Sequence, residues 1–124
     1  MQYLAIFAGG GLGSLCRYGI SKISIPYFTS FPIHTLLANL FASAILGFLT
    51  GLFLVKFSDA SDEWKLFAAT GFCGGFSTFS TFSLETFKLI QNDQSVLAML
   101  YVITSVAICV GMIYGGHCFA KVVV

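Results

Sequence analysis

The segment GFCGGFSTFSTF, at residues 71–82, contains the residue types and spacing that could do chemistry most directly. Phe76, Phe79 and Phe82 are three residues apart, so on a helix they form a row along one side. A phenyl ring has an electropositive edge, and rings presented edge-on can attract an anion without offering it a permanent charge. The alternative is an ordinary apolar helix face, but serines and threonines alternate with the rings and give the segment a polar character that such a face lacks.

Three glycines, Gly71, Gly74 and Gly75, lie at the start of the same segment. Glycine weakens a helix, and the hydroxyls that follow can satisfy the backbone groups that a break releases. We therefore expect a local break over residues 71–77. Its exposed carbonyl oxygens would suit a small hard cation, especially if two antiparallel copies brought their breaks together.

An asparagine, Asn39, lies in the middle of the apolar stretch TLLANLFAS. A buried amide needs partners, and Asn39 could either join helices by hydrogen bonds or present an N–H to a dehydrated anion. Thr35 lies four residues earlier, on the same helix face, and could extend a polar track for that anion. Both interpretations of the amide stay open on the residues alone.

Arg17 follows a run of small residues, GGGLGSLCRYG, in which the glycines allow another helix to approach closely. A guanidinium at the edge of an apolar segment either extends to the membrane surface or faces a wet cavity. In the second case its fixed charge would draw anions into a vestibule.

Near the C-terminus, Tyr101, Ser105 and Cys109 are spaced by four residues, so they form one polar or polarisable stripe on a helix. The stripe could line a permeation path or serve helix packing. Glu85 and Lys88, three residues apart, are adequately explained by pairing with each other at the membrane interface.

The elements that must position these residues are membrane helices. Of the 124 residues, 57% are hydrophobic and 9% are charged, whereas the charged share of a soluble domain is about a quarter. Spans of roughly 20 apolar residues recur along the chain. We expect an all-α membrane protein forming a single domain over residues 1–124, with its third helix broken at the centre. The four expected transmembrane helices cover about residues 3–20, 34–55, 65–90 and 95–120.

Several other classes of site receive no support from the sequence. The four cysteines form no CxxC pair, and each lies inside an apolar run, so we expect them to pack. His34 and His117 have no ligand partner at helical spacing, which disfavours a metal site made by side chains. The basic residues are scattered and the net charge is +1, so nucleic acid is not an expected partner.

Charge is balanced between the two sides that four crossings would create. Lys56, Lys65 and Lys121 would lie on one side, and the other three basic residues on the second, so the positive-inside rule gives no orientation. Such a chain can insert both ways, and two copies in opposite orientation would pair around a two-fold axis in the membrane plane. One fixed orientation set by weaker signals is the alternative.

The chain resembles the Fluc/CrcB family of fluoride channels. The resemblance rests on GGGLGSLCRYG, on TLLANLFAS and above all on GFCGGFSTFSTFS, and it covers all four segments in order. It implies an antiparallel, dual-topology homodimer with two pores, embedded in the lipid of the inner (cytoplasmic) membrane of a microbe. It also implies a structural Na+ at the dimer centre and passive export of fluoride that limits fluoride toxicity, without enzymatic turnover.

The resemblance further implies site residues, carried over by position. The fluoride pathway would include the aromatic pair Phe79 and Phe82, the amide Asn39, the hydroxyls of Ser80 and Thr81, and Tyr101 and Ser105 on the fourth helix. Arg17 would lie in the aqueous vestibule. Gly74 and Ser77 would give backbone carbonyls to Na+, and Phe76 would pack. Cys109 and Ile113 stand where hydroxyls are common in relatives, so the end of the track differs here.

The rival function is a small four-helix exporter of cationic compounds driven by protons. It would need a membrane-embedded carboxylate, and Glu85 is the only acid within an expected crossing. Its place late in the third segment, near Lys88, speaks against such coupling. A non-transporting membrane subunit is a third possibility, in which the aromatic row only packs.

Overall fold

The computed structural model describes residues 1–24 and 30–124, and this part of the chain is helical without a β-strand. Pro26, an expected helix breaker, lies outside the described residues. The helices, in chain order, are α1 (Gln2–Ser24), α2 (Ile33–Val55), α3 (Asp62–Lys65), η1 (Leu66–Cys73), α4 (Gly74–Phe76), α5 (Phe79–Gln91) and α6 (Ser95–Val123). The first, second and fourth expected segments are thus single helices, and the third comprises four pieces.

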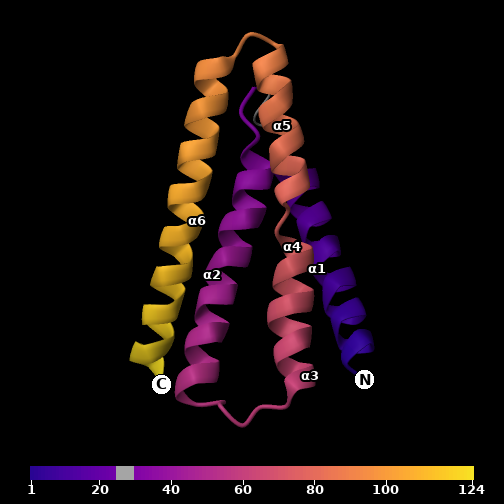
Figure 1. The fold of residues 1–124 in the computed structure, drawn as a ribbon, viewed down its shortest axis with the longest axis vertical. Helices are drawn as coiled ribbons and strands as arrows, with labels where there is room; N and C mark the ends of the chain where they lie inside the picture. Colours follow the sequence, from indigo (N-terminus) through magenta and orange to yellow (C-terminus); the bar gives the residue numbers. More distant parts are fainter. Residues whose placement is uncertain (25–29) are drawn as a thin grey trace.

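The helices run alongside one another (Figure 1). Both termini and the connector at residues 56–61 lie at one end, and the turn between α5 and α6 lies at the other. Helix α2 pairs with α6, and α1 packs along η1 and α4. The two pairs meet where α2 also contacts α1 and η1.

The third segment contains two kinds of irregularity. Residues Leu66–Cys73 form a π-helical stretch, and α4 continues it with helical geometry at Gly74, where φ is −65° and ψ is −38°. Helix α4 ends at Phe76, and Ser77 and Thr78 are extended, with ψ of 158° and 119°. The interruption therefore lies just after the glycines, not at them.

Two of these glycines, Gly71 and Gly75, allow close helix contact, whereas Gly74 faces open space. A Cβ on Gly75 would meet the backbone carbonyl of Gly10, and a Cβ on Gly71 would come within 3.0 Å of the carbonyl of Ile6. On the other pair of helices, a Cβ on Gly47 would meet the backbone of Ile113. Small residues let backbones approach at such contacts, which is how membrane helices gain packing energy.

Large apolar side chains cover the outside of the fold. Phe7 is 80% exposed, and Leu15, Val110 and Tyr114 are also exposed, whereas Tyr101 is the one large side chain among the described residues that is fully buried. Helices α2 and α6 are each long and apolar enough to cross a membrane. An apolar exterior of this extent matches lipid or a partner surface rather than water.

Candidate functional site

The extended residues between α4 and α5 are held by Asn39 of α2. The backbone N–H of Thr78 donates to Asn39 Oδ1 at 2.7 Å, and Asn39 Nδ2 donates to the Thr78 carbonyl at 3.2 Å. One side-chain amide thus replaces the neighbouring strand or helical turn that an extended backbone would need. Because Nδ2 carries two hydrogens, one N–H of Asn39 remains after this pairing.

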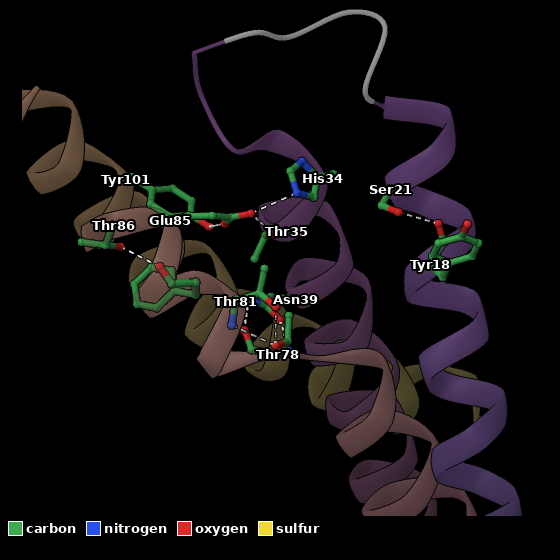
Figure 2. A network of polar contacts seen from close by, with 11 residues as sticks. Tyr18, Ser21, His34, Thr35, Asn39, Thr78, Thr81, Glu85, Thr86 and Tyr101 are labelled. Carbon is green, nitrogen blue, oxygen red and sulfur yellow. Dashed lines mark hydrogen bonds and ion pairs between the residues drawn. The ribbon is translucent and has the colours of Figure 1, made fainter. Parts of the chain in front are cut away.

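Thr78 also caps α5. Its Oγ1 accepts from the backbone N–H of Thr81 at 3.3 Å, donates to Thr81 Oγ1 at 3.1 Å and lies 3.3 Å from Ser80 Oγ. A threonine at this position satisfies one of the N–H groups that a helix leaves unpaired at its start. The hydroxyls of Thr78, Ser80 and Thr81 are therefore gathered at the N-terminus of α5, and Figure 2 shows those of Thr78 and Thr81.

These hydrogen bonds release the two carbonyls that the resemblance assigns to a cation. In an unbroken helix the Gly74 carbonyl would accept from the Thr78 N–H, and the Ser77 carbonyl from the Thr81 N–H. Both N–H groups are instead directed to side-chain oxygens. The Ser77 carbonyl receives only a long bond, 3.5 Å, from Arg17 Nη1.

A cavity of about 180 Å³ has Gly74 and Ser77 in its wall, together with Ser43 and Thr70. Gly74 is exposed, and a Cβ added to it would meet nothing within 4 Å. No cluster of three metal-ligating side chains occurs in the described ranges. A cation here would thus depend on backbone and hydroxyl oxygens, which are the ligands of hard cations.

Three aromatic rings form a continuous row from α5 to α6. The Phe79 and Phe82 centroids are 5.5 Å apart at 41°, and the Phe82 and Tyr101 centroids are 5.1 Å apart at 48°. Tyr101 is fully buried, while Phe79 is 79% exposed. The row therefore begins in the core and ends on the surface of the chain.

A cavity of about 260 Å³ lies beside this row. Its lining residues are Asn39, Ser43, Ser77, Thr78, Phe79, Phe82, Ser105, Val106 and Cys109. The lining contains hydroxyls, an amide and two phenyl rings but no formally charged group. Ser105 is 5% exposed, and its Oγ is buried without a hydrogen-bond partner in the described structure. An unpaired buried hydroxyl is costly, which makes it a ready ligand for an ion that reaches the cavity.

A second cavity, of about 320 Å³, adjoins the first through Thr78, which lines both. Arg17 supplies its positive charge, and its remaining lining residues are Ser14, Tyr18, Ser21, His34, Thr35 and Thr81. The guanidinium is half-buried and reaches the helix interruption at the Ser77 carbonyl. Polar walls and a fixed positive charge give this second cavity an electrostatic potential that favours anions.

Glu85 forms the centre of a polar cluster beside the second cavity (Figure 2). Thr35 Oγ1 donates to Glu85 Oε1 at 2.8 Å, and the Tyr101 hydroxyl donates to Oε2 at 2.8 Å. His34 Nε2 lies 3.0 Å from Oε1. The expected pairing of Glu85 with Lys88 does not occur among the described residues, because the carboxylate turns inward to α2 and α6 while Lys88 is exposed.

Residues 4–117 match the family described as CrcB-like protein, Camphor Resistance (CrcB). The chain belongs to this family. It is 47% identical over 118 residues to a protein of Pyrococcus abyssi named "Fluoride-specific ion channel FluC", covering 95% of this chain and 94% of that one. A protein of the same name from Pyrococcus horikoshii is 44% identical, covering 94% and 93%. "Fluoride-specific ion channel FluC 2" of Nitrobacter hamburgensis is 40% identical, covering 94% of each.

The resemblance found in the sequence is thereby confirmed, and this CrcB-like chain is a membrane protein. Its structure brings most of the implied pathway residues together around the two cavities. The first cavity is lined by Asn39, Phe79, Phe82 and Ser105, and the second by Thr35 and Thr81. Tyr101 reaches the site through its ring contact with Phe82. Ser80 is exposed and reaches it through its contact with Thr78.

Two residues of the CrcB-like site were missed by reasoning from the sequence. The spacing of Glu85 and Lys88 favours pairing between them, and no partner for His34 lies at helical spacing. A signal exists for Glu85, which lies three residues after Phe82, on the side of α5 that carries the rings. None exists for His34, because a spacing of five residues puts it on a different helix face from Asn39. The contact between His34 and Glu85 spans 51 positions of the chain, so no local spacing reveals it.

Proposed function

We propose that this CrcB-like chain is a fluoride-selective passive channel that exports fluoride across the cytoplasmic membrane. The observation that carries the proposal is the uncharged lining of the cavity beside Phe79 and Phe82, where Asn39 and the unpartnered Ser105 hydroxyl also lie. Relatives over nearly the full length are named fluoride-specific ion channels. The conclusion concerns conduction rather than covalent chemistry.

The geometry supports a path in two stages. Arg17 in the second cavity, which we call the outer cavity, draws anions toward the helix interruption. In the cavity beside the aromatic row, which we call the inner cavity, the free N–H of Asn39, the hydroxyl of Ser105 and the ring edges replace part of the ion's hydration shell. A conducting site must bind strongly enough to admit an ion and weakly enough to release it, and neutral donors meet both demands.

The driving force is the electrochemical gradient. A membrane potential that is negative inside expels a monovalent anion with about 2.3 kcal/mol per 100 mV. Hydrogen fluoride crosses a bilayer as a neutral molecule and ionises inside, so fluoride accumulates unless the ion has its own way out. A passive channel is then enough to limit fluoride toxicity.

The functional unit in this proposal is an antiparallel homodimer with four crossings per chain. Phe79 at 79% exposure leaves one end of the aromatic row uncovered in a single chain, and a second copy would cover it. The basic residues are divided evenly between the two ends of the fold, which permits both orientations. Opposed copies would place the two helix interruptions near the membrane midplane.

A structural Na+ fits the carbonyls of Gly74 and Ser77. Their helical N–H partners are directed elsewhere, so these oxygens are free to coordinate. Two chains would supply four carbonyl oxygens, and a hard cation accepts such ligands. When bound, the ion would neutralise converging carbonyl dipoles and hold the two interruptions together.

The test is fluoride efflux from liposomes that contain the purified protein. We expect efflux without a proton gradient, with selectivity over chloride, and at least about a tenfold loss in Phe79→Ile and Asn39→Asp, as removal of one well-placed donor costs in other sites. Phe7→Ile is the matched control, because Phe7 is 80% exposed and lies outside both cavities. Equal chloride flux, or efflux of cationic dyes that requires a proton gradient, would contradict the channel.

A further inference from the structure

His34 and Glu85 form a pair of ionisable groups beside the outer cavity. His34 Nε2 lies 3.0 Å from Glu85 Oε1, and the side chains are 34% and 16% exposed. His34 also lines the cavity that holds Arg17. His34 is thus the more exposed side chain of the pair and Glu85 the more buried one. Figure 2 shows their contact.

The carboxylate of Glu85 is fixed by its other contacts. Thr35 donates to Oε1 and Tyr101 donates to Oε2, each at 2.8 Å. Both donors belong to the polar surroundings of the ion path, and the Tyr101 ring contacts Phe82. A negative charge is therefore held at a fixed place next to the route of an anion.

The charge of this pair depends on His34. With a neutral imidazole the pair carries one negative charge, and with an imidazolium it carries none. Among residues 1–24 and 30–124, the other ionisable groups that face it are Arg17 and Tyr18 from α1 and Tyr101 from α6. Arginine and tyrosine side chains ordinarily keep their charge state between about pH 5 and 8, whereas histidine changes its charge in that range.

We propose that His34 is a positioning residue that sets, through Glu85, the electrostatic barrier to fluoride at the channel entrance. Protonation of His34 neutralises the carboxylate, and the positive charge of Arg17 then acts on fluoride unopposed. Conduction therefore rises as the pH is lowered, because imidazole is the side chain of this group that gains a charge. This inference rests on the proposed channel function.

The direction of the effect suits the task of an exporter. Fluoride is the conjugate base of a weak acid, so acid surroundings increase the neutral form that leaks across the bilayer. A channel whose conductance rises in acid would export fastest when inward leakage is fastest.

The experiment is fluoride current across a planar bilayer at a fixed voltage, with the same pH on both sides. Current excludes the leak of neutral hydrogen fluoride, which carries no charge. We expect the wild-type current to rise roughly threefold between about pH 7.5 and about pH 5.5, at the low end of electrostatic effects on ion capture because the histidine is partly screened.

Three variants separate charge from structure. His34→Gln keeps a hydrogen-bond donor but no proton to gain, so its current should stay at the low level at both pH values. His34→Lys carries a fixed charge, so its current should stay high at both. His117→Gln is the control, because His117 lies beside Gly51, about 25 Å further along α2 at about 1.5 Å per residue; it should keep the wild-type response.

The outcomes distinguish this inference from the channel function. A pH response that persists in His34→Gln, or a flat wild-type profile with normal fluoride current, would overturn the role of His34 and leave the channel standing. Absence of fluoride current from every variant, wild type included, would overturn the channel function itself and this role with it.

Discussion

Asn39 and Ser105 contact the same cavity, but their hydrogen-bonding states differ. The Asn39 amide holds the Thr78 backbone by two hydrogen bonds, whereas the Ser105 hydroxyl has no partner in the described part of the chain. The two uses considered for Asn39 are thus compatible, because an amide with two donor hydrogens can join helices and still offer an N–H. Ser105 has no such structural task.

This difference predicts that two substitutions which both lower fluoride flux have different effects on the free energy of unfolding. Ser105→Ala should lower fluoride flux several-fold but leave the free energy of unfolding unchanged or raise it by about 1 kcal/mol, because an unpaired buried hydroxyl is removed. Asn39→Ala should lower both, with a loss of about 1–3 kcal/mol for the unpaired Thr78 backbone. Thermal unfolding in detergent and liposome efflux measure the two quantities.

Ser83→Ala is the control for these variants, since Ser83 is an exposed serine on α5 outside both cavities. It should change neither quantity. A Ser105→Ala protein that conducts normally would remove Ser105 from the pathway.

At the level of helices, the glycines of α1 are not equivalent. A Cβ on Gly13 would meet the backbone of Phe72 and come within 2.7 Å of the Phe76 backbone nitrogen, whereas a Cβ on Gly11 would meet nothing within 4 Å. The first contact is between backbones, which cannot move aside as a flexible side chain can. The packing of α1 on η1 and α4 therefore depends on Gly13.

We predict that Gly13→Ala destabilises the protein by about 1–3 kcal/mol, the usual cost of overpacking a tight contact. Gly11→Ala should be neutral or stabilising by up to about 1 kcal/mol, because alanine favours a helix more than glycine does. Thermal unfolding of both variants under identical conditions provides the comparison. Equal stabilisation of both variants would mean that helix propensity and not the contact with Phe72 controls the effect.

The helices could be predicted from the sequence because long apolar stretches and polar connectors depend only on neighbouring residues, not on tertiary contacts. The position of the interruption could not, because it depends on Asn39, which pairs with Thr78 from 39 residues away. Gly71 and Gly75 favour a break by their local propensity, but in the folded chain they allow close packing against α1. Phe79 and Phe82 contact each other as their spacing predicts, but Phe76 lies before the interruption and contacts Phe72 instead. The place of Tyr101 in the row and the inward turn of Glu85 depend on contacts between helices, so sequence spacing does not reveal them.

At the level of the whole molecule, positive charge is divided between the two ends. Lys56, Lys65 and Lys121 belong to the 56–61 connector, to α3 and to the last turn of α6, which lie at the end with the termini (Figure 1). Lys22 and Lys88 belong to the last turns of α1 and α5, at the opposite end, and Arg17 lies in the second half of α1. An asymmetric count would fix one orientation during insertion. This chain has no such asymmetry, and in the proposed dimer a second copy would cover the exposed ring of Phe79.

The proposed Na+ site predicts a specific dependence on cations. Exchange of Na+ for N-methylglucamine should lower the thermal stability of the dimer and shift it toward monomer, because four converging carbonyl oxygens would then repel one another. Size-exclusion chromatography and thermal unfolding in each salt, at matched ionic strength, test this. Insensitivity of both to the cation would remove Gly74 and Ser77 from a metal site without affecting the fluoride pathway.

Dual topology predicts how two connectors are labelled in cells. In a variant whose four native cysteines are replaced, Ser58→Cys tests the connector at residues 56–61, and Asn92→Cys tests the turn between α5 and α6; both residues are exposed and lie at opposite ends of the fold. If copies insert both ways, a membrane-impermeant maleimide should label about half of each variant from outside, because neither orientation is favoured by charge. Full labelling of one variant and none of the other would establish a single orientation and exclude an antiparallel pair.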